Sequence, residues 1–368
     1  VGGDGVMAKL GDIATYINGY AFKPQDWSDE GVPIIRIQDL TGNSYQANRY
    51  NGEYASKYEV NDGDVLISWS ASLGVYVWHG EKAVLNQHIF KVVFDKERIS
   101  KDFFVHQVGL ILENAASDAH GATMKHLTKP VFDALPFYLP PYEKQCEIAE
   151  VLDKVTSLIS LRKQQLAKLD ELVKARFVEM FGDFEVNPKE FPVYHLCELC
   201  DVGSSKRIYQ EEQSISGIPF LKVADLNELI DTGKYLCSTF IPLERYEQLL
   251  HKELTPKEND ILITSRGTLG KCYIVQSDDE FYFQDGMISW LSNLSPKVSS
   301  IYISYLFAQP YIQKQIESLQ AGSTVAYLSI AMLKKMNVIL PPKKLQDDFA
   351  TFVEHVDQQK QTVQQSLE

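Results

Sequence analysis

Apolar positions between residues 142 and 180 recur at alternating steps of four and three residues. This spacing keeps one stripe of a long helix facing a partner helix, as in a coiled coil. Two prolines at 140–141 and a glycine at 182 suit the start and the end of such a helix. The pattern therefore predicts a long helix over residues 140–182. Its expected contact seam consists of Ile148, Leu152, Val155, Ile159, Leu166, Leu169 and Val173.

The same spacing returns at residues 341–368, where each seam position lies 201 residues after one in the first helix (349 − 148). We expect this second helix to be shorter than the first. Antiparallel pairing is favoured, because parallel pairing would require the intervening chain to loop back. The expected seam of the second helix consists of Phe349, Val353, Val356, Val363 and Leu367.

Other blocks of sequence recur in the same order along the chain, with slowly growing offsets. The recurring pairs are 32–40 (VPIIRIQDL) with 218–226 (IPFLKVADL), 61–68 (NDGDVLIS) with 257–264 (KENDILIT), and 139–145 with 340–346, which share Leu-Pro-Pro-x-x-x-Gln. Several blocks in one order indicate an internal duplication with loop insertions.

Between the two helical stretches, the sequence predicts mixed α/β structure. Short apolar runs bounded by Gly, Asp and Asn predict strands at 33–37, 65–69, 74–78 and 89–94. Three- and four-residue steps predict helices at 101–114 and 300–317. We expect an α+β chain with a pseudo-twofold internal repeat. Its expected parts are a tag or flexible start (1–8), a first globular domain (9–139), the long helix (140–182), a linker (183–192), a second globular domain (193–340) and the shorter helix (341–368).

Composition narrows the class of protein. The chain has 368 residues, 45% of them hydrophobic and 23% charged, as expected for a globular protein with two or more domains. No stretch approaches a membrane span in length, and five cysteines, an odd number, favour a reducing, cytoplasmic setting. The net charge of −13 argues against nonspecific nucleic-acid binding by the whole surface. A local basic cleft remains compatible with that charge.

The sequence contains no complete catalytic motif. GxGxxG, GxxxxGK[ST], HExxH and GxSxG are all missing. The pair Cys197 and Cys200 has no second pair at zinc spacing. Residues 139–142 and 187–189 each resemble a fragment of the Asn/Asp-Pro-Pro-aromatic motif of amino-methyltransferases, but neither is complete. We therefore expect no catalytic residue, metal or cofactor in this chain.

Two pairs of matched loops carry residue types that contact DNA. These loops are 68–74 with 264–271, and 120–126 with 321–327. Small hydroxyl residues and glycines allow close approach to phosphates, and Arg266 could hold a guanine edge with two bonds. The alternative is that these loops are merely solvated. The candidate DNA-binding residues of the first domain are Arg36, Gln38, Asn43, Gln46, Asn48, Arg49, Tyr50, Ser68, Trp69, Ser70, Ser72, Thr123 and Lys125. Those of the second domain are Lys222, Asn227, Lys234, Tyr235, Arg245, Ser265, Arg266, Thr268, Lys271, Ser323 and Thr324.

The combination of two alternating domains and helices, the repeated Leu-Pro-Pro-x-x-x-Gln stretch and the junction at 180–189 resembles the specificity subunit of type I restriction–modification enzymes (HsdS). The resemblance implies that each domain reads one half of a split target in double-stranded DNA. It also implies that the paired helices set the spacing and dock two methylase subunits, which methylate adenine using S-adenosylmethionine. Restriction and translocation subunits would join them to cut unmodified DNA.

Two alternatives to this interpretation remain. The chain could be the recognition portion of a split type II-like restriction–methyltransferase, or a coiled-coil interaction scaffold without DNA specificity. A gene for a methylase subunit beside this one would favour the type I system. A methylase complex without sequence preference on DNA would favour the scaffold.

Overall fold

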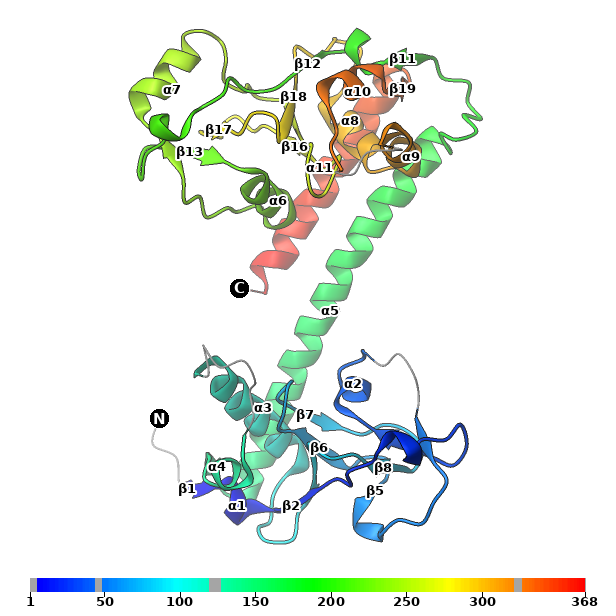
Figure 1. Cartoon of the computed structure of the whole chain (residues 1–368), viewed down its shortest axis with the longest axis vertical. Coiled ribbons are helices and arrows are strands. Elements are labelled where there is room, and N and C mark those ends of the chain that lie inside the picture. The colour runs from blue at the N-terminus through cyan, green and yellow to red at the C-terminus, as the bar shows by residue number, and fades with distance from the viewer. Residues whose placement is uncertain (1–4, 44–47, 119–126, 321–325, 368) are drawn as a thin grey trace. The chain divides into compact units, whose positions relative to one another are not determined.

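A computed structural model describes residues 5–43, 48–118, 127–320 and 326–367. The chain divides into two compact units, Val1–Ser160 and Leu161–Glu368 (Figure 1). The boundary falls within the long helix α5 (Tyr142–Phe181), which begins in unit 1 and ends in unit 2. No helix in the described ranges is long and apolar enough to cross a membrane.

Unit 1 contains three small sheets. β1 (Val6–Lys9) pairs antiparallel with β10 (Pro136–Leu139). A four-stranded antiparallel sheet has the order β2 (Thr15–Asn18), β9 (Ile89–Val93), β6 (Val65–Ser68), β7 (Gly74–Val77). A second sheet has the order β4 (Arg49–Tyr50), β3 (Val32–Ile35), β8 (Ala83–Leu85), β5 (Glu59–Val60), in which β3 and β8 are parallel. The helices that precede α5 are α1 (Leu10–Ile13), α2 (Ile37–Leu40), α3 (Lys101–Asp118) and α4 (Lys129–Asp133).

Unit 2 repeats this topology, except that its third sheet has no counterpart of β5 among the described residues. β11 (Val193–His195) pairs with β19 (Asn337–Ile339). The larger sheet has the order β12 (Asp201–Gly203), β18 (Ile288–Ser292), β15 (Ile261–Thr264), β16 (Cys272–Ile274), and the third has the order β14 (Phe240–Ile241), β13 (Ile218–Leu221), β17 (Tyr282–Phe283). The β13–β17 pair is parallel, like β3–β8. The helices are α6 (Val223–Thr232), α7 (Leu243–Leu250), α8 (Ser300–Phe307), α9 (Pro310–Leu319), α10 (Ile330–Lys335) and α11 (Lys343–Gln365).

Matching sheets in matching order confirm the predicted mixed α/β class and show why the recurring blocks are apolar. In β6, Val65 and Ile67 pack in the core with α3, whereas Leu66 faces the core beside β3 and β8. Ile261, Leu262 and Ile263 of β15 divide between two cores in the same way. Because both faces of these strands are covered, their sequence is continuously apolar instead of alternating.

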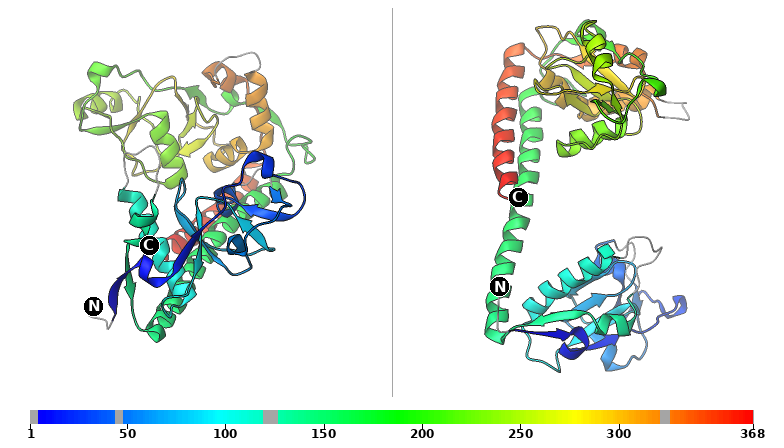
Figure 2. Two further views of the ribbon diagram at one scale, coloured as in Figure 1. Left: turned by 60° about the horizontal axis from the view of Figure 1, so that its bottom comes forward. Right: turned by 90° about the vertical axis from the view of Figure 1, so that its left-hand side faces the viewer.

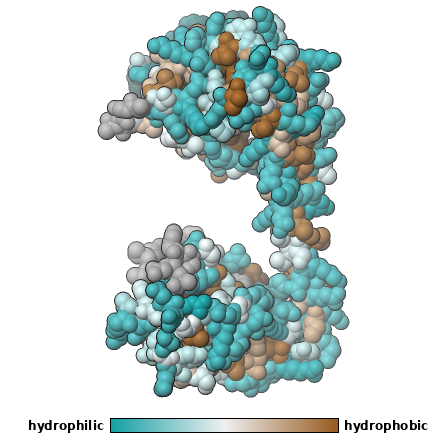
Figure 3. All heavy atoms as spheres, turned by 90° about the vertical axis from the view of Figure 1, so that its right-hand side faces the viewer, coloured by the Kyte–Doolittle hydropathy of each residue, from teal (hydrophilic) through white to brown (hydrophobic). Residues whose placement is uncertain are grey.

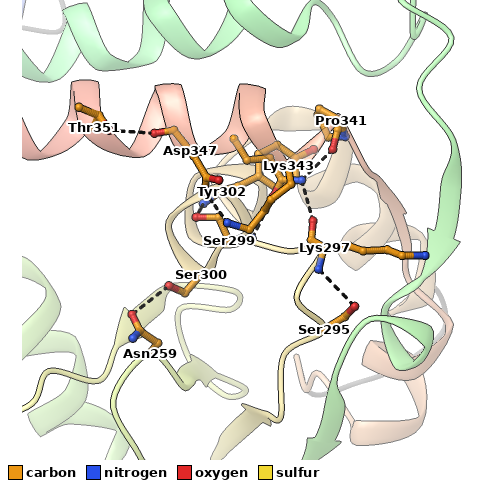
Figure 4. Close-up of polar contacts among 11 residues, drawn as sticks. Asn259, Ser295, Lys297, Ser299, Ser300, Tyr302, Pro341, Lys343, Asp347 and Thr351 are labelled. Carbon is orange, nitrogen blue, oxygen red and sulfur yellow. Dashed lines mark hydrogen bonds and ion pairs between the residues drawn. The ribbon is translucent and has the colours of Figure 1, made fainter.

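The repeated glutamine of Leu-Pro-Pro-x-x-x-Gln joins the start of each long helix to a neighbouring helix. The N–H of Ser100 donates to Oε1 of Gln145 at 2.8 Å, and the N–H of Ser299 donates to Oε1 of Gln346 at 2.9 Å. The amide group of Gln346 also donates to the carbonyls of Lys297 and Pro341 (Figure 4). Both glutamine side chains are buried, so this motif has a structural role.

Within unit 2, the end of α5 packs along α11 (Figures 1 and 2). The rings of Phe177 and Phe349 lie 5.3 Å apart. Toward the start of α5 and the end of α11, Nζ of Lys360 lies 2.5 Å from Oδ1 of Asp170. Later residues of α5 therefore contact earlier residues of α11, so the two helices are antiparallel where they pack together.

Only part of the predicted seam has a helical partner within the described part of the chain. Leu169 and Val173 pack in the core with Phe349, Val353 and Val356. Ile148 packs against the core of unit 1 instead. In contrast, Leu152, Val155 and Ile159 are 37%, 45% and 41% exposed. The remaining seam residues are half-buried Leu166 and Leu367 and buried Val363.

Two sequence-based boundaries need correction. Residues 6–9 form strand β1, although a flexible start was expected over 1–8. The expected helix at 300–317 is two helices, because Pro310 cannot continue the hydrogen bonding of α8 and instead begins α9. Residues 183–192, the expected linker, connect α5 to β11. Phe184 in this segment is buried in the core of unit 2, and Nζ of Lys189 donates to the carbonyl of Met180, in the last turn of α5, at 2.5 Å.

Candidate nucleic-acid interface

One short connection in unit 1 holds several polar loops together at one edge of the sheets. We call residues 86–88, between β8 and β9, hub loop 1. The N–H of Asn86 donates to the carbonyl of Ile35 at 3.1 Å, and that of Gln87 donates to the carbonyl of Tyr20 at 2.8 Å. The carbonyl of His88 accepts from the N–H of Trp69 at 3.2 Å. The segments that follow β2, β3 and β6 therefore meet at this loop.

Residues 284–287, hub loop 2, do the same between β17 and β18 in unit 2. The N–H of Gln284 donates to the carbonyl of Leu221, and the N–H of Ser265 donates to the carbonyl of Met287, both at 2.9 Å. Oγ of Ser204 accepts from the N–H of Gly286 at 3.2 Å. The strand topology explains why both units have such a loop. In unit 1 the carboxyl ends of β2 and β6 lie beside the amino end of β9, and in unit 2 the carboxyl end of β15 lies beside the amino end of β18.

The residues that directly follow the second pair of matched loops bind the loops that follow β6 and β15. The N–H of Leu127 donates to the carbonyl of Trp69 at 3.1 Å, and that of Leu328 donates to the carbonyl of Ser265 at 3.0 Å. Arg266 and Tyr327 form an isolated antiparallel bridge. Leu127, Tyr327 and Leu328 therefore lie beside the first pair of matched loops, whereas residues 120–126 and 321–325 lie outside the described part of the chain. Candidates that lie outside the described residues are Gln46, Thr123, Lys125, Ser323 and Thr324.

Several unit 1 candidates are occupied within the fold, and we withdraw them as DNA contacts. Ser68, Ser70 and Asn48 are buried, and Oγ of Ser68 donates to the carbonyl of Ser70 at 3.2 Å. The guanidinium of Arg49 donates to the carbonyl of Gly31 and to Glu81, both at 2.6 Å. Ser68 and Arg49 thus bind partners inside the protein, and burial keeps Ser70 and Asn48 away from the surface.

The other unit 1 candidates divide into anchored and exposed groups. Arg36 lies over the ring of Trp27 and 3.8 Å from Asp39, and the ring of Tyr50 packs on Phe22. Trp69 is half-buried, with its Nε1 donating to Oδ1 of Asn18 at 3.1 Å. The accessible polar candidates are Gln38, Asn43 and Ser72.

Unit 2 shows a similar division. Ser265 is buried with its Oγ 2.7 Å from Oγ of Ser289, and we withdraw it. Arg245 pairs with Glu212 at 3.0 Å and Lys271 with Asp231 at 2.6 Å, so both are neutralised internally and are also withdrawn. The remaining candidates are half-buried Asn227 and Tyr235, and exposed Lys222, Lys234, Arg266 and Thr268.

The structure brings forward residues that the sequence search missed. Asn86 and Gln87 are half-buried in hub loop 1, and Lys206 and Arg207 are exposed beside hub loop 2. Nε of Arg207 lies 2.8 Å from Oδ2 of Asp285, which fixes this pair at the edge. The recurring sequence blocks do not reach these residues, so their equivalence is visible only in the matching strand order of the two units.

Two copies of one α/β unit, each gathering polar loops at one edge, define a duplicated recognition protein. No group of histidine, cysteine and acidic residues capable of holding a metal occurs within the described ranges. The model of the type I restriction modification DNA specificity domain family matches residues 4–171 and 188–368. The chain belongs to this family, which confirms its sequence-based identification as a specificity subunit.

Named relatives and solved structures agree with this membership. The chain is 25% identical to the type I restriction enzyme EcoBI specificity subunit of Escherichia coli, covering 94% of this chain and 78% of that protein. It is 29% identical to the putative specificity subunit S.HindORF215P of Haemophilus influenzae, covering 91% and 86%. The S subunit structure from M. genitalium shares the fold, with a TM-score of 0.58, 16% identity, and coverage of 99% of this chain and 92% of that one.

Proposed function

We propose that this chain reads a split target in double-stranded DNA, with unit 1 reading one half and unit 2 the other. The observation that carries the proposal is the shared convergence of polar loops on hub loops 1 and 2. A duplicated scaffold with different loop chemistry suits two different half-sites, because base edges are distinguished by their donors and acceptors. A pseudo-twofold relation between the units would suit DNA strands that run in opposite directions.

The proposed contacts are exposed and half-buried candidates, together with residues within or beside the hub loops. In unit 1 they are Gln38, Asn43, Trp69, Ser72, Asn86 and Gln87. In unit 2 they are Lys206, Lys222, Lys234, Arg266, Thr268 and Tyr327. With a net charge of −13, the isolated chain should bind DNA weakly, and methylase partners would supply additional phosphate contacts.

The exposed part of α5 supports a second element of the proposal. Apolar side chains remain at the surface of this helix (Figure 3), among them Val151 and Leu158, each 59% exposed. Together with Leu152, Val155 and Ile159 they form a set that we call the α5 stripe. Such a face is typical of a protein-interaction site. It is the proposed docking face for the two methylase subunits, and through them for the restriction and translocation subunits.

Exchange of one globular domain tests the proposal. The full chain is produced with its methylase subunits, and methylated adenines are mapped across a genome. Replacing residues 9–139 by the domain of another family member should change one half of the methylated sequence and leave the other half intact. The reciprocal replacement of 193–340 is the matched control and should change only the opposite half. A change in both halves after either exchange would contradict the division of labour.

A further inference from the structure

We infer that Arg266 selects a guanine in the half-site that unit 2 reads, and that unit 1 has no cation at the equivalent backbone position. The two halves of the target therefore differ at this point. The inference rests on the proposed function and deepens it, because it assigns one base class to one side chain.

The loop that carries Arg266 is held in place by hydrogen bonds between its own residues. Oγ1 of Thr264 donates to the carbonyl of Thr268 at 2.5 Å and accepts from the N–H of Lys271 at 3.0 Å. Gly267 has a φ of 74°, a left-handed conformation that suits glycine. Arg266 itself bridges to Tyr327 through the backbone. A side chain on such a braced loop loses little freedom when it binds.

The guanidinium of Arg266 also differs from its neighbours in charge environment. Arg176, Arg207 and Arg245 of unit 2 each lie within 3.0 Å of a carboxylate oxygen. Arg266 is exposed, and its nearest polar contact among the described residues is Sδ of Met287, 3.9 Å from Nη1. A thioether is a weak acceptor. The positive charge and the donors of Arg266 therefore remain available at the edge of the sheets.

Guanine is the base that matches these donors. Its O6 and N7 are adjacent acceptors in the major groove, and arginine reaches both with two parallel N–H groups. Adenine places an amino group at the O6 position, which would face an arginine donor. A good bidentate pair discriminates by roughly 5- to 100-fold between bases. Lysine presents a single point charge, so it reproduces the charge without the forked geometry.

Unit 1 has a comparable turn at this position, with different chemistry and one residue fewer before the next strand. Ser70 occupies the position equivalent to Arg266 (266 − 70 = 196, the offset of the strands), and it is buried. Ala71 has a φ of 60° where Gly267 has 74°. Both loops place a left-handed residue directly after this position, so the change from a buried serine to an exposed arginine alters the chemistry that the loop presents.

The test uses the full chain in complex with its methylase subunits and duplexes randomised at the target. Arg266→Ala should relax a guanine requirement at one position of one half-site by about 5- to 100-fold, and leave the other half unchanged. Compared with Arg266→Ala, Arg266→Lys should recover more of the DNA-binding affinity than of the preference for guanine. Lys297→Ala is the control, since this exposed cation lies beyond the opposite end of β18.

The outcomes separate the hypotheses. A uniform loss for all sequences, with a weaker salt dependence, would identify a phosphate contact and overturn the inference. An unchanged preference after Arg266→Ala would also overturn it. The proposed function fails separately, if exchange of whole domains leaves the methylated sequence unchanged. Thermal melting of each variant shows whether the fold is intact, and removal of this exposed side chain should leave the melting temperature unchanged.

Discussion

Nε1 of Trp290 donates to Oδ2 of Asp260 at 2.9 Å, in the place where Nζ of Lys91 lies 3.1 Å from Oδ2 of Asp64 in unit 1. Both aspartates also accept a backbone N–H from three residues earlier, at 2.9 Å in each unit. The duplicated turn is therefore the same, while its second partner is an indole in one unit and an ammonium in the other. Unit 2 consequently buries a carboxylate without a lysine at that position.

This difference predicts a pH effect specific to unit 2. Burial raises the pKa of Asp260 above its ordinary value of 3.8, while the N–H groups of Lys257 and Trp290 act in the opposite direction. Between 3.8 and the folded pKa, the native state holds more protons than the unfolded state, so the free energy of unfolding falls as pH rises. Trp290→Phe removes one hydrogen bond that lowers the pKa of Asp260, so this pKa should rise further. The free energy of unfolding should then continue to fall up to a higher pH.

Urea unfolding from about pH 4 to pH 7 measures this effect. Trp290→Phe should also lower the free energy of unfolding at neutral pH by about 1–3 kcal/mol, because a charged acceptor loses its donor. Asp260→Asn should flatten the pH dependence in both backgrounds. Identical pH profiles for the wild type and Trp290→Phe would show that the indole does not influence this carboxyl.

The buried glutamine at the start of α11 gives a stability prediction. Gln346 is 0% exposed and satisfies three backbone groups, from Lys297, Ser299 and Pro341. Gln346→Leu should lower the free energy of unfolding by at least about 2 kcal/mol, since these groups stay buried without a partner. Gln361→Leu, on the exposed side of α11, should be close to neutral. Equal effects of the two changes would contradict the anchoring role.

The sequence predicted the elements better than their contacts. Periodicity identified α5 and α11, but the exposure of Leu152 and Val155 depends on where α11 lies along α5, which spacing alone does not specify. Ser68 and Ser265 resemble loop hydroxyls in sequence, yet both are buried, with their hydroxyl groups bound to Ser70 and Ser289. Hub loops 1 and 2 escaped detection because they share no sequence, and only tertiary hydrogen bonds reveal their equivalence.

The α5 stripe provides an assembly prediction. Val155→Glu with Ile159→Glu should leave the folding of the isolated chain intact, because both side chains are already more than 40% exposed. The charges should prevent burial against an apolar partner and so abolish co-purification with the methylase subunits. Ser157→Glu adds a charge on another side of the same helical turn and is the matched control. Normal assembly of the double variant would exclude the stripe as the docking face.

Spacing between the half-sites tests α5 as a ruler. This helix has 40 residues, so it is about 60 Å long if straight. Inserting one heptad into both α5 and α11 adds about 10 Å while keeping the seam in phase. We expect the nonspecific gap in the methylated sequence to grow by about three base pairs, given about 3.4 Å per pair. Insertion of five residues instead turns the seam by roughly 140° and should disrupt assembly. An unchanged gap in an active heptad variant would mean that the helices do not set the spacing.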